Sequence, residues 1–281
     1  MYVIRNVFKC KPGKSKALIE KFKATHELMK KDIPLDDRIL VDEVAGFWTV
    51  VVEVNVGNIA EFEDRMKERG SREDVQQAMA GWFRDEGLVA DADPNVSVGP
   101  NAGNPHYLPT ADAHRPITAD EIVLLDLWGK LEVPGAVFAD ITWMGFTGRR
   151  VPDRFAKAFA TIVEARDAAI GLVKQAAQAG RELHGFEVDR AASAVIRQAG
   201  YGTQILHRTG HSLGESVHGN GVNMDDYETH DDRRLLPGTG FTIEPGIYFE
   251  DFGVRTEINM IVTARDAEVT GPLQTEFVAV V

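Results

Sequence analysis

The sequence predicts an α+β protein built from two modules that join near residue 70. Residues 1–69 contain 13 Lys and Arg against 12 Asp and Glu, whereas the remaining residues contain 18 against 31. Short β-branched runs fill much of the first module. Amphipathic helical patterns follow it, and the last forty residues are strand-like. The change in charge and pattern therefore divides the chain into residues 1–69 and 70–281.

The first module has the order β-α-β-β-α. The strand-like runs and helical patterns cover residues 2–8, 15–31, 38–44, 47–56 and 58–69. This order resembles a ferredoxin-like unit of the dimeric α+β barrel type, which implies that the module pairs two chains as a homodimer. A small monooxygenase activity in this module is the alternative, but no acid–base pair or cofactor motif supports it.

Helices are expected at three places in the second module. The first pattern runs from Ser71 to Gly87, the second from Pro152 to Ala179, and the third starts at Gly185. The first and third patterns both begin with acidic residues and end at glycine, and a polar stretch and a strand follow each. This similarity hints at an internal duplication.

The overall composition excludes several classes of protein. A net charge of −12 argues against non-specific nucleic-acid binding, which requires a basic face. No run of about 18 apolar residues is present, so we expect no membrane span. The first residues lack the pattern of a signal peptide. Cys10 is the single cysteine and is expected to be inert. It cannot form an internal disulfide, which fits a cytoplasmic protein.

Four carboxylates lie in apolar, strand-like sequence. Asp126 is expected at the end of a strand, and Asp140 in the facing strand of a hairpin that turns at Pro134-Gly135. Glu244 and Glu257 lie in the strand-rich part near the C-terminus. One such acid is more often a turn or cap residue than a ligand. Several together are costly to bury unless they bind a cation, so they indicate a metal site.

Histidines occur in two glycine-containing segments. The segment HRTGHSLGESVHGNG supplies His207, His211 and His218, and GPNAGNPHYLPT supplies His106. His207 and His211 have the i, i+4 spacing of a zinc-binding helix. We reject that motif because glycines interrupt the segment and because no glutamate follows His207.

Four short stretches resemble those of the pita-bread metallopeptidases in the same order. They are GPNAGNPHYLPT, VLLDLWGKLEVPGAVFADITW, HRTGHSLGESVHGNG and FTIEPGIYFEDFGVRTEINMIV. The most distinctive parts are TGHSLG with His218 after it, TIEPGIY and GVRTE, and NPHYLPT adds support. That family includes methionine aminopeptidase, aminopeptidase P and prolidase, with creatinase as a metal-free relative, and the resemblance covers roughly residues 71–281. It implies a pita-bread fold and five metal ligands. These are Asp126, Asp140, His211, Glu244 and Glu257.

The resemblance also implies the reaction and the remaining roles. Glu244 would be both ligand and general base, and His218 with His207 would stabilise the oxyanion. His106 and Arg255 would contact the substrate. A ligand set rich in oxygen fits two divalent ions, of Mn, Co, Fe or Zn, that activate a bridging hydroxide. The expected reaction is hydrolysis of an amide bond in a short peptide, with an Xaa-Pro bond as the best candidate.

One spacing departs from the family pattern. The interval from Asp126 to Asp140 is longer by a few residues, which a lengthened hairpin can accommodate if both carboxylates stay on one face. The first module also stands where the first long helix of a pita-bread domain is expected.

Two alternative functions remain. A non-peptidase amidohydrolase or a metal-dependent lyase could use the same scaffold, and a binding protein could retain an inactive site. A metal-free, creatinase-like enzyme is less well supported, because such relatives lose ligands whereas this chain has all five.

Overall fold

The computed structural model describes residues 2–9, 19–21, 23, 36–41, 49–56, 72–110 and 113–280. The chain divides into two compact units, Met1–Glu68 and Arg69–Val281, and each is described by itself. None of the helices in the described ranges is long and apolar enough to cross a membrane.

The first unit contains a three-stranded antiparallel sheet with the order β1-β3-β2. Its strands are β1 (Tyr2–Lys9), β2 (Asp36–Val41) and β3 (Thr49–Val56). They overlap the three strand-like runs in the sequence. A helix is expected over residues 15–31. Residues 19–21 and 23 are helical, and the rest of this range lies outside the described residues. The helix expected over residues 58–69 lies wholly outside them. The ferredoxin-like assignment therefore stays a prediction.

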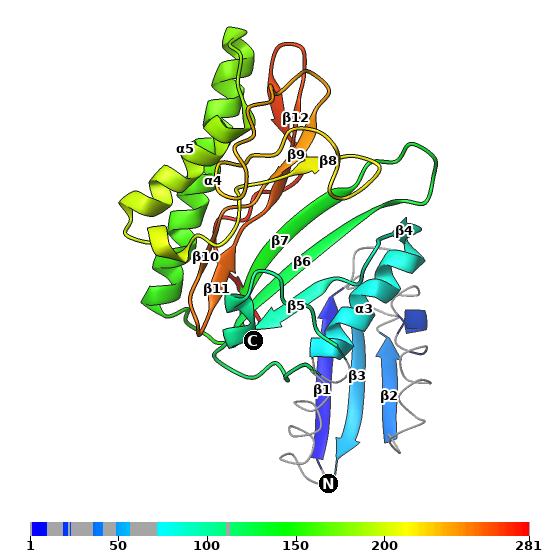
Figure 1. Cartoon of the computed structure of the whole chain (residues 1–281). Helices are drawn as coiled ribbons and strands as arrows, with labels where there is room; N and C mark the ends of the chain where they lie inside the picture. Colours follow the sequence, from blue (N-terminus) through cyan, green and yellow to red (C-terminus); the bar gives the residue numbers. More distant parts are fainter. Residues whose placement is uncertain are drawn as a thin grey trace. The chain divides into compact units, whose positions relative to one another are not determined.

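Two sheets and a two-stranded ribbon form the β-structure of the second unit (Figure 1). The first sheet has the order β14-β7-β6-β4, with β5 also paired to β6, and contains β4 (Leu88–Val89), β5 (Asn95–Val98), β6 (Ile122–Leu131), β7 (Ala139–Phe146) and β14 (Val278–Ala279). The second has the order β13-β12-β9-β8 and contains β8 (Ser212–Leu213), β9 (Gly240–Ile243), β12 (Ile258–Val262) and β13 (Ala267–Val269). The ribbon joins β10 (Gly246–Tyr248) and β11 (Gly253–Arg255).

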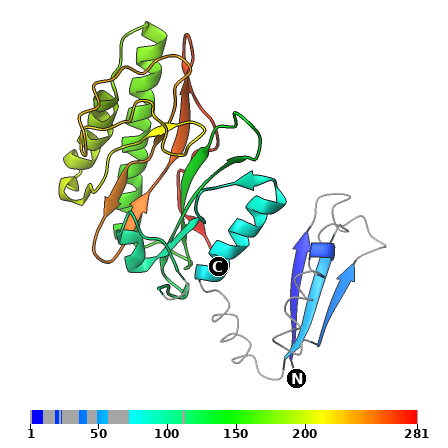
Figure 2. The same cartoon turned by 45° about the vertical axis from the view of Figure 1, so that its right-hand side comes forward.

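The expected helices are present as α3 (Arg72–Asp85), α4 (Asp153–Ala179) and α5 (Gly185–Gln198). Two short 3₁₀ helices, η1 (Gly99–Gly103) and η2 (Gly202–Gln204), complete the unit. Gly180 caps the C-terminal end of helix α4, and its left-handed φ of 63° suits a residue without a side chain. Figures 1 and 2 show α4 and α5 packed together along one face of the strands. Their buried apolar residues form the main core with β9 to β12.

The β6–β7 hairpin corrects one expectation and supports another. Asp126 lies in the middle of β6 rather than at its end, because the strand continues to Leu131. Asp126 pairs with Thr142 on β7, and Asp140 is two residues before Thr142. Since successive side chains on a strand alternate between faces, Asp126 and Asp140 share one face of the sheet. The lengthened loop thus keeps both carboxylates on the same side.

Candidate metal centre

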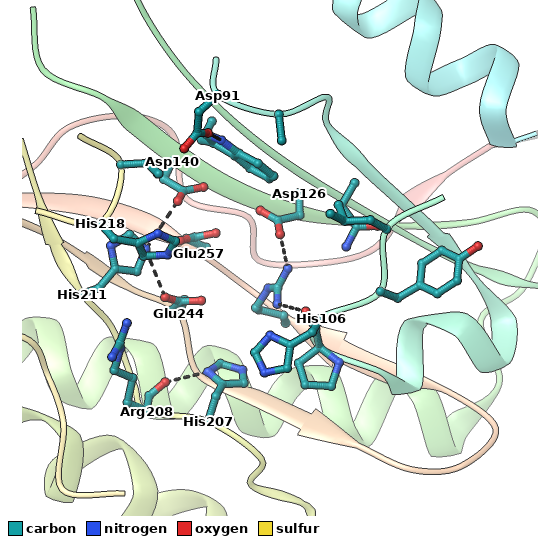
Figure 3. Close-up of a pocket in the computed structure, with 18 of the residues that line it drawn as sticks. Asp91, His106, Asp126, Asp140, His207, Arg208, His211, His218, Glu244 and Glu257 are labelled. Atoms are coloured by element: carbon teal, nitrogen blue, oxygen red, sulfur yellow. Dashed lines mark hydrogen bonds and ion pairs between the residues drawn. The ribbon is translucent and has the colours of Figure 1, made fainter. Parts of the chain in front are cut away.

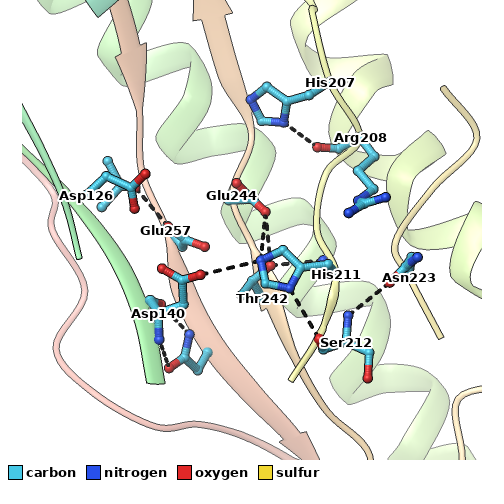
Figure 4. A network of polar contacts seen from close by, with 12 residues as sticks. Asp126, Asp140, His207, Arg208, His211, Ser212, Asn223, Thr242, Glu244 and Glu257 are labelled. Carbon is cyan, nitrogen blue, oxygen red and sulfur yellow. Dashed lines mark hydrogen bonds and ion pairs between the residues drawn. The ribbon is translucent and has the colours of Figure 1, made fainter. Parts of the chain in front are cut away.

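Three residues from different strands and loops bring potential metal ligands together. One ligand atom each from Asp140, His211 and Glu257 lies within 4.8 Å of the others, and all three residues are buried. Asp140 is on β7, His211 immediately precedes β8, and Glu257 lies between β11 and β12. Figure 4 shows their side chains converging on one point. This geometry is typical of a metal site with mixed carboxylate and imidazole ligands.

The other two predicted ligands border this cluster. Glu244 follows β9, and its Oε1 lies 3.5 Å from Nε2 of His211. Asp126 forms an ion pair with the buried guanidinium of Arg255. Both carboxylates line the same cavity as the three clustered residues. All five predicted ligands therefore face one pocket, although Asp126 is engaged by Arg255.

The surroundings of His211 direct Nε2 toward the carboxylates. Nδ1 lies 3.2 Å from the carbonyl oxygen of Ser212, and Nε2 lies 3.4 Å from Oδ2 of Asp140. A proton on Nδ1 donated to that carbonyl leaves Nε2 available as a ligand. The preceding Gly210 permits this placement, because a Cβ there would lie 2.1 Å from the backbone oxygen of Thr242 on β9.

One hydroxyl group connects the basic and acidic parts of the site. Thr142 accepts a hydrogen bond from Nε of Arg255 at 3.0 Å and donates one to Oε2 of Glu257 at 2.8 Å. Asn259 donates to the backbone oxygen of Asp140 and accepts from its N–H at 3.0 Å. These contacts fix the positions of two predicted ligands, and such supporting hydrogen bonds tune metal affinity in proteins.

The donor set fits divalent cations. Oδ1 of Asp140 is buried and has no hydrogen-bond partner among the described residues. A buried carboxylate oxygen without a partner is costly, and a cation beside it would remove that cost. Four carboxylates also balance two divalent ions, which makes a loaded site about neutral. Hard oxygen donors with one imidazole suit Mn²⁺, Fe²⁺, Co²⁺ or Zn²⁺.

Burial and mutual repulsion shift the pKa values of the predicted carboxylate ligands. Burial, helped by nearby Asp126 and Glu244, raises the pKa of Asp140 to about 7, although the hydrogen bond from His211 lowers it. Burial and three neighbouring carboxylates raise the pKa of Glu257 well above its usual value. Burial would also raise the pKa of Glu244, but the positive charge of its neighbours, His211 foremost, lowers it.

We expect metal-free protein to lose thermal stability as the pH rises from about 4 to about 7. Burial raises the pKa of Asp140 from 3.8 to about 7, so the folded state holds a proton that the unfolded chain releases in this range. The melting temperature should be about 5 °C lower at pH 8 than at pH 5. Mn²⁺ should reverse most of this loss at pH 8. A melting temperature that stays constant or rises from pH 5 to pH 8 would contradict the prediction.

The three remaining predicted histidines lie around the same cavity (Figure 3). The ring centroid of His218 is 4.5 Å from that of His211, and burial together with His211 lowers its pKa. Nε2 of His207 lies 2.7 Å from the hydroxyl oxygen of Tyr248, and burial lowers the pKa of His207. His106 is exposed, and its backbone N–H donates to Oδ1 of Asn104 at 3.0 Å. Nδ1 of His207 lies 2.6 Å from the carbonyl oxygen of Arg208, so the single N–H of its neutral ring donates there and Nε2 accepts from Tyr248. His218 remains as the hydrogen-bond donor to the cavity.

Arg255 reaches the cavity with most of its hydrogen-bonding groups occupied. Besides Asp126 and Thr142, it contacts the hydroxyl oxygen of Tyr248 and the carbonyl oxygen of Pro105, each at 3.4 Å. Only 4% of the residue is exposed. Its observed contacts orient Asp126, and a role in substrate binding stays a prediction.

Sequence reasoning missed the buried Asp189 on α5. Its Oδ1 accepts hydrogen bonds from the backbone N–H and the hydroxyl of Thr209, and its Oδ2 accepts from the N–H of Asp226 at 2.7 Å. The carbonyl oxygen of Thr209 in turn accepts from the N–H of Glu244 at 2.7 Å. Asp189 therefore anchors to α5 the loop that carries His211, and Thr209 of that loop in turn contacts Glu244. A single helical aspartate gives no pattern that predicts this.

Replacing Asp189 with Asn should destabilise the protein by about 1–3 kcal/mol and weaken metal binding, because one of the three donors loses its acceptor. Thermal melting and calorimetric titration with Mn²⁺ measure the two effects. Arg190→Gln is the matched control, since Arg190 contacts Asp226 from the exposed side without touching Thr209. Unchanged Mn²⁺ affinity in the Asp189→Asn protein would count against this positioning role.

The cavity that contains these residues has a volume of about 420 Å³. Its lining includes the five predicted ligands and all the predicted catalytic and substrate-binding residues, together with Arg208 and Glu228. Such a volume suits a small ligand such as a short peptide.

Comparisons with known proteins identify the family to which the chain belongs. Residues 51–264 match metallopeptidase family M24. The chain therefore belongs to metallopeptidase family M24, which confirms the predicted resemblance. The matched region begins within β3 of the first unit, further upstream than the resemblance in the sequence suggested.

The chain is similar to several dipeptidases over part of their length. It is 36% identical to an Xaa-Pro dipeptidase of Lactobacillus helveticus over 169 residues, which is 60% of this chain and 41% of that protein. It is 31% identical to the probable dipeptidase PepE of Mycobacterium tuberculosis over 184 residues, 63% of this chain and 45% of that protein. The chain thus spans less than half the length of these curated relatives.

Solved structures show the same fold. Dipeptidase PepE from Mycobacterium ulcerans matches with a TM-score of 0.65 and 27% identity, over 79% of this chain and 57% of that one. Xaa-Pro dipeptidase from Bacillus anthracis matches with a TM-score of 0.62 and 27% identity, over 75% and 55% respectively. These similarities and the family match confirm the predicted α+β class and the pita-bread fold.

Proposed function

We propose that this chain is a metal-dependent hydrolase that cleaves an amide bond in short peptides, with the Xaa-Pro bond as its preferred target. The observation that carries the proposal is the convergence of Asp140, His211 and Glu257 in a cavity of peptide size, with one oxygen of Asp140 that has no hydrogen-bond partner in the described part of the chain. Xaa-Pro dipeptidases among the relatives support the choice of bond.

The ligands in this proposal are Asp126, Asp140, His211, Glu244 and Glu257, and they hold two divalent ions. When bound, the ions supply Lewis acidity and lower the pKa of a coordinated water to near neutral.

The surrounding residues perform the proton transfers and stabilise charge. Glu244 has the lowered pKa of a carboxylate that is ionised at neutral pH, so it can accept a proton and later deliver it to the leaving amine. In this proposal His218 lines the cavity as the donor for the oxyanion of the tetrahedral intermediate, and His207 assists through its contact with Tyr248, since its own N–H donates to the carbonyl oxygen of Arg208. His106 and Arg255 contact the peptide in this proposal.

Metal analysis and a peptide assay test this function together. Bound metal per chain is measured first, and hydrolysis of free and N-acetylated Xaa-Pro peptides is then followed after addition of Mn²⁺, Co²⁺ or Zn²⁺. We expect up to two ions per chain and cleavage of Xaa-Pro in preference to Xaa-Ala peptides. Bound metal without peptide cleavage would instead favour a non-peptidase amidohydrolase or a lyase. A chain that binds no metal would favour a binding protein or a metal-free, creatinase-like enzyme.

The same proposal includes a homodimer formed through the sheet of the first unit and a cytoplasmic location. The antiparallel order β1-β3-β2 leaves two edge strands in that sheet among the described residues. Light scattering of the full chain should give twice the mass of one chain, and a monomeric mass at micromolar concentration would contradict the pairing.

A further inference from the structure

A second group of side chains lies beside the proposed ligands and has no part in the mechanism. Trp128 is on β6, two residues after Asp126, and its backbone pairs directly with that of Asp140 on β7. Because alternate residues on a strand share a face, Trp128 projects from the same face as the two carboxylates. Trp128, Val217 and Asp91 all line the cavity.

The indole of Trp128 is held in place from two sides. It packs against a small apolar cluster of Phe138, Leu213 and Val217. Its Nε1–H donates a hydrogen bond to Oδ1 of Asp91 at 2.5 Å. The wall of the cavity at this point is therefore apolar and aromatic, and it ends in a carboxylate whose orientation the indole fixes (Figure 3).

The carboxylate of Asp91 forms no ion pair with the described residues. His218 is near enough for Asp91 to raise its pKa, but burial and His211 lower that pKa by more. Of the other carboxylates in the cavity, Glu228 pairs with Arg208 at 3.3 Å, and the remaining four are the proposed ligands. Asp91 forms no ion pair with any of the described residues, and the indole N–H that it accepts is neutral. A negative charge at the end of an apolar wall is complementary to a long side chain with a cationic tip.

We propose that Asp91, Trp128 and Val217 form a subsite for a basic side chain, lysine or arginine, on the amino-terminal residue of the peptide. The methylene stem of that side chain lies along Trp128 and Val217, and its cationic group meets the carboxylate of Asp91. This inference rests on the proposed peptide hydrolysis and specifies its substrate class.

The test compares two dipeptides that differ only in the charged group. Norleucine has the same four-carbon stem as lysine without the ammonium, so kcat/KM for Lys-Pro divided by that for norleucine-Pro measures the charge preference. In Mn²⁺-loaded protein, Asp91→Asn should lower this ratio about tenfold. Trp128→Phe keeps the aromatic wall but loses the N–H, and should lower the ratio about threefold. The matched control is Asp93→Asn, which removes the same charge two residues away, at an exposed carboxylate that contacts Gln77 outside the cavity. It should keep the wild-type ratio.

The outcomes separate this inference from the proposed function. An unchanged ratio in Asp91→Asn protein, while the wild type cleaves both dipeptides, overturns the subsite alone. Asp91→Asn could also lower kcat/KM equally for both dipeptides and leave kcat/KM for their N-acetyl forms unchanged. Asp91 would then contact the α-ammonium group of the peptide, and the proposed subsite would be overturned. If the wild type cleaves neither dipeptide, the proposed hydrolysis is wrong. The charge preference is then measured as the ratio of Kd values, by calorimetric titration of the Mn²⁺-loaded proteins with both dipeptides, and an equal ratio in wild type and Asp91→Asn overturns the subsite.

Discussion

Glu244→Gln protein is expected to lose bound metal and turnover together. Glu244 lies 3.5 Å from His211, its backbone N–H is fixed by Thr209, and neighbouring positive charge keeps it ionised. An amide at this position removes one negative charge from the ligand set and the acceptor of the proton. We expect kcat to fall by on the order of 10²–10⁴, the range for a lost proton-transfer group. Metal content by mass spectrometry and initial rates measure the two losses.

Glu228→Gln is the matched control for metal binding, because Glu228 lines the same cavity but pairs with Arg208. It should retain the metal content of the wild type. Full metal occupancy in Glu244→Gln protein would exclude Glu244 as a ligand and leave it, at most, the role of a base.

His218→Ala protein should instead keep its metal and lose turnover. His218 is exposed and lies beside His211 without belonging to the cluster of ligand atoms. Loss of one donor to an oxyanion typically lowers kcat by on the order of 10²–10³. Rates at saturating metal and substrate should show this fall while metal content stays constant.

His230→Ala serves as the control for loss of an exposed imidazole, since His230 contacts Asp226 and Phe186 and does not line the cavity. Turnover in His218→Ala protein equal to that of the His230→Ala protein would assign His218 to the protein surface and remove it from the mechanism.

The sequence predicted the site residues that lie in short segments with a recognisable order along the chain. The segments around His211, Glu244 and Glu257 predicted a shared site, and the three side chains face one cavity. The helical patterns at 71–87, 152–179 and from 185 agree with α3, α4 and α5, because each has apolar residues at helical spacing.

Contacts between distant residues were not predictable in the same way. Arg255 and Asp126 are 129 positions apart, and nothing local to either one indicates that they pair. Thr142 and Tyr248 each contribute a hydroxyl whose role depends on the neighbours that the fold supplies. The strand end expected at Asp126 was wrong because pairing with β7 continues β6 through Gly129, a residue that weakens strand patterns in sequence.

The close approach of Gly210 to Thr242 has a consequence for the history of this site. The spacing between the backbone segments that carry His211 and Glu244 depends on the absence of one methyl group, since any side chain at residue 210 would force Thr242 away. A related protein that no longer binds metal through both ligands does not require this spacing, so alanine or serine could replace glycine at residue 210. We therefore expect glycine at this position in related sequences that keep both ligands.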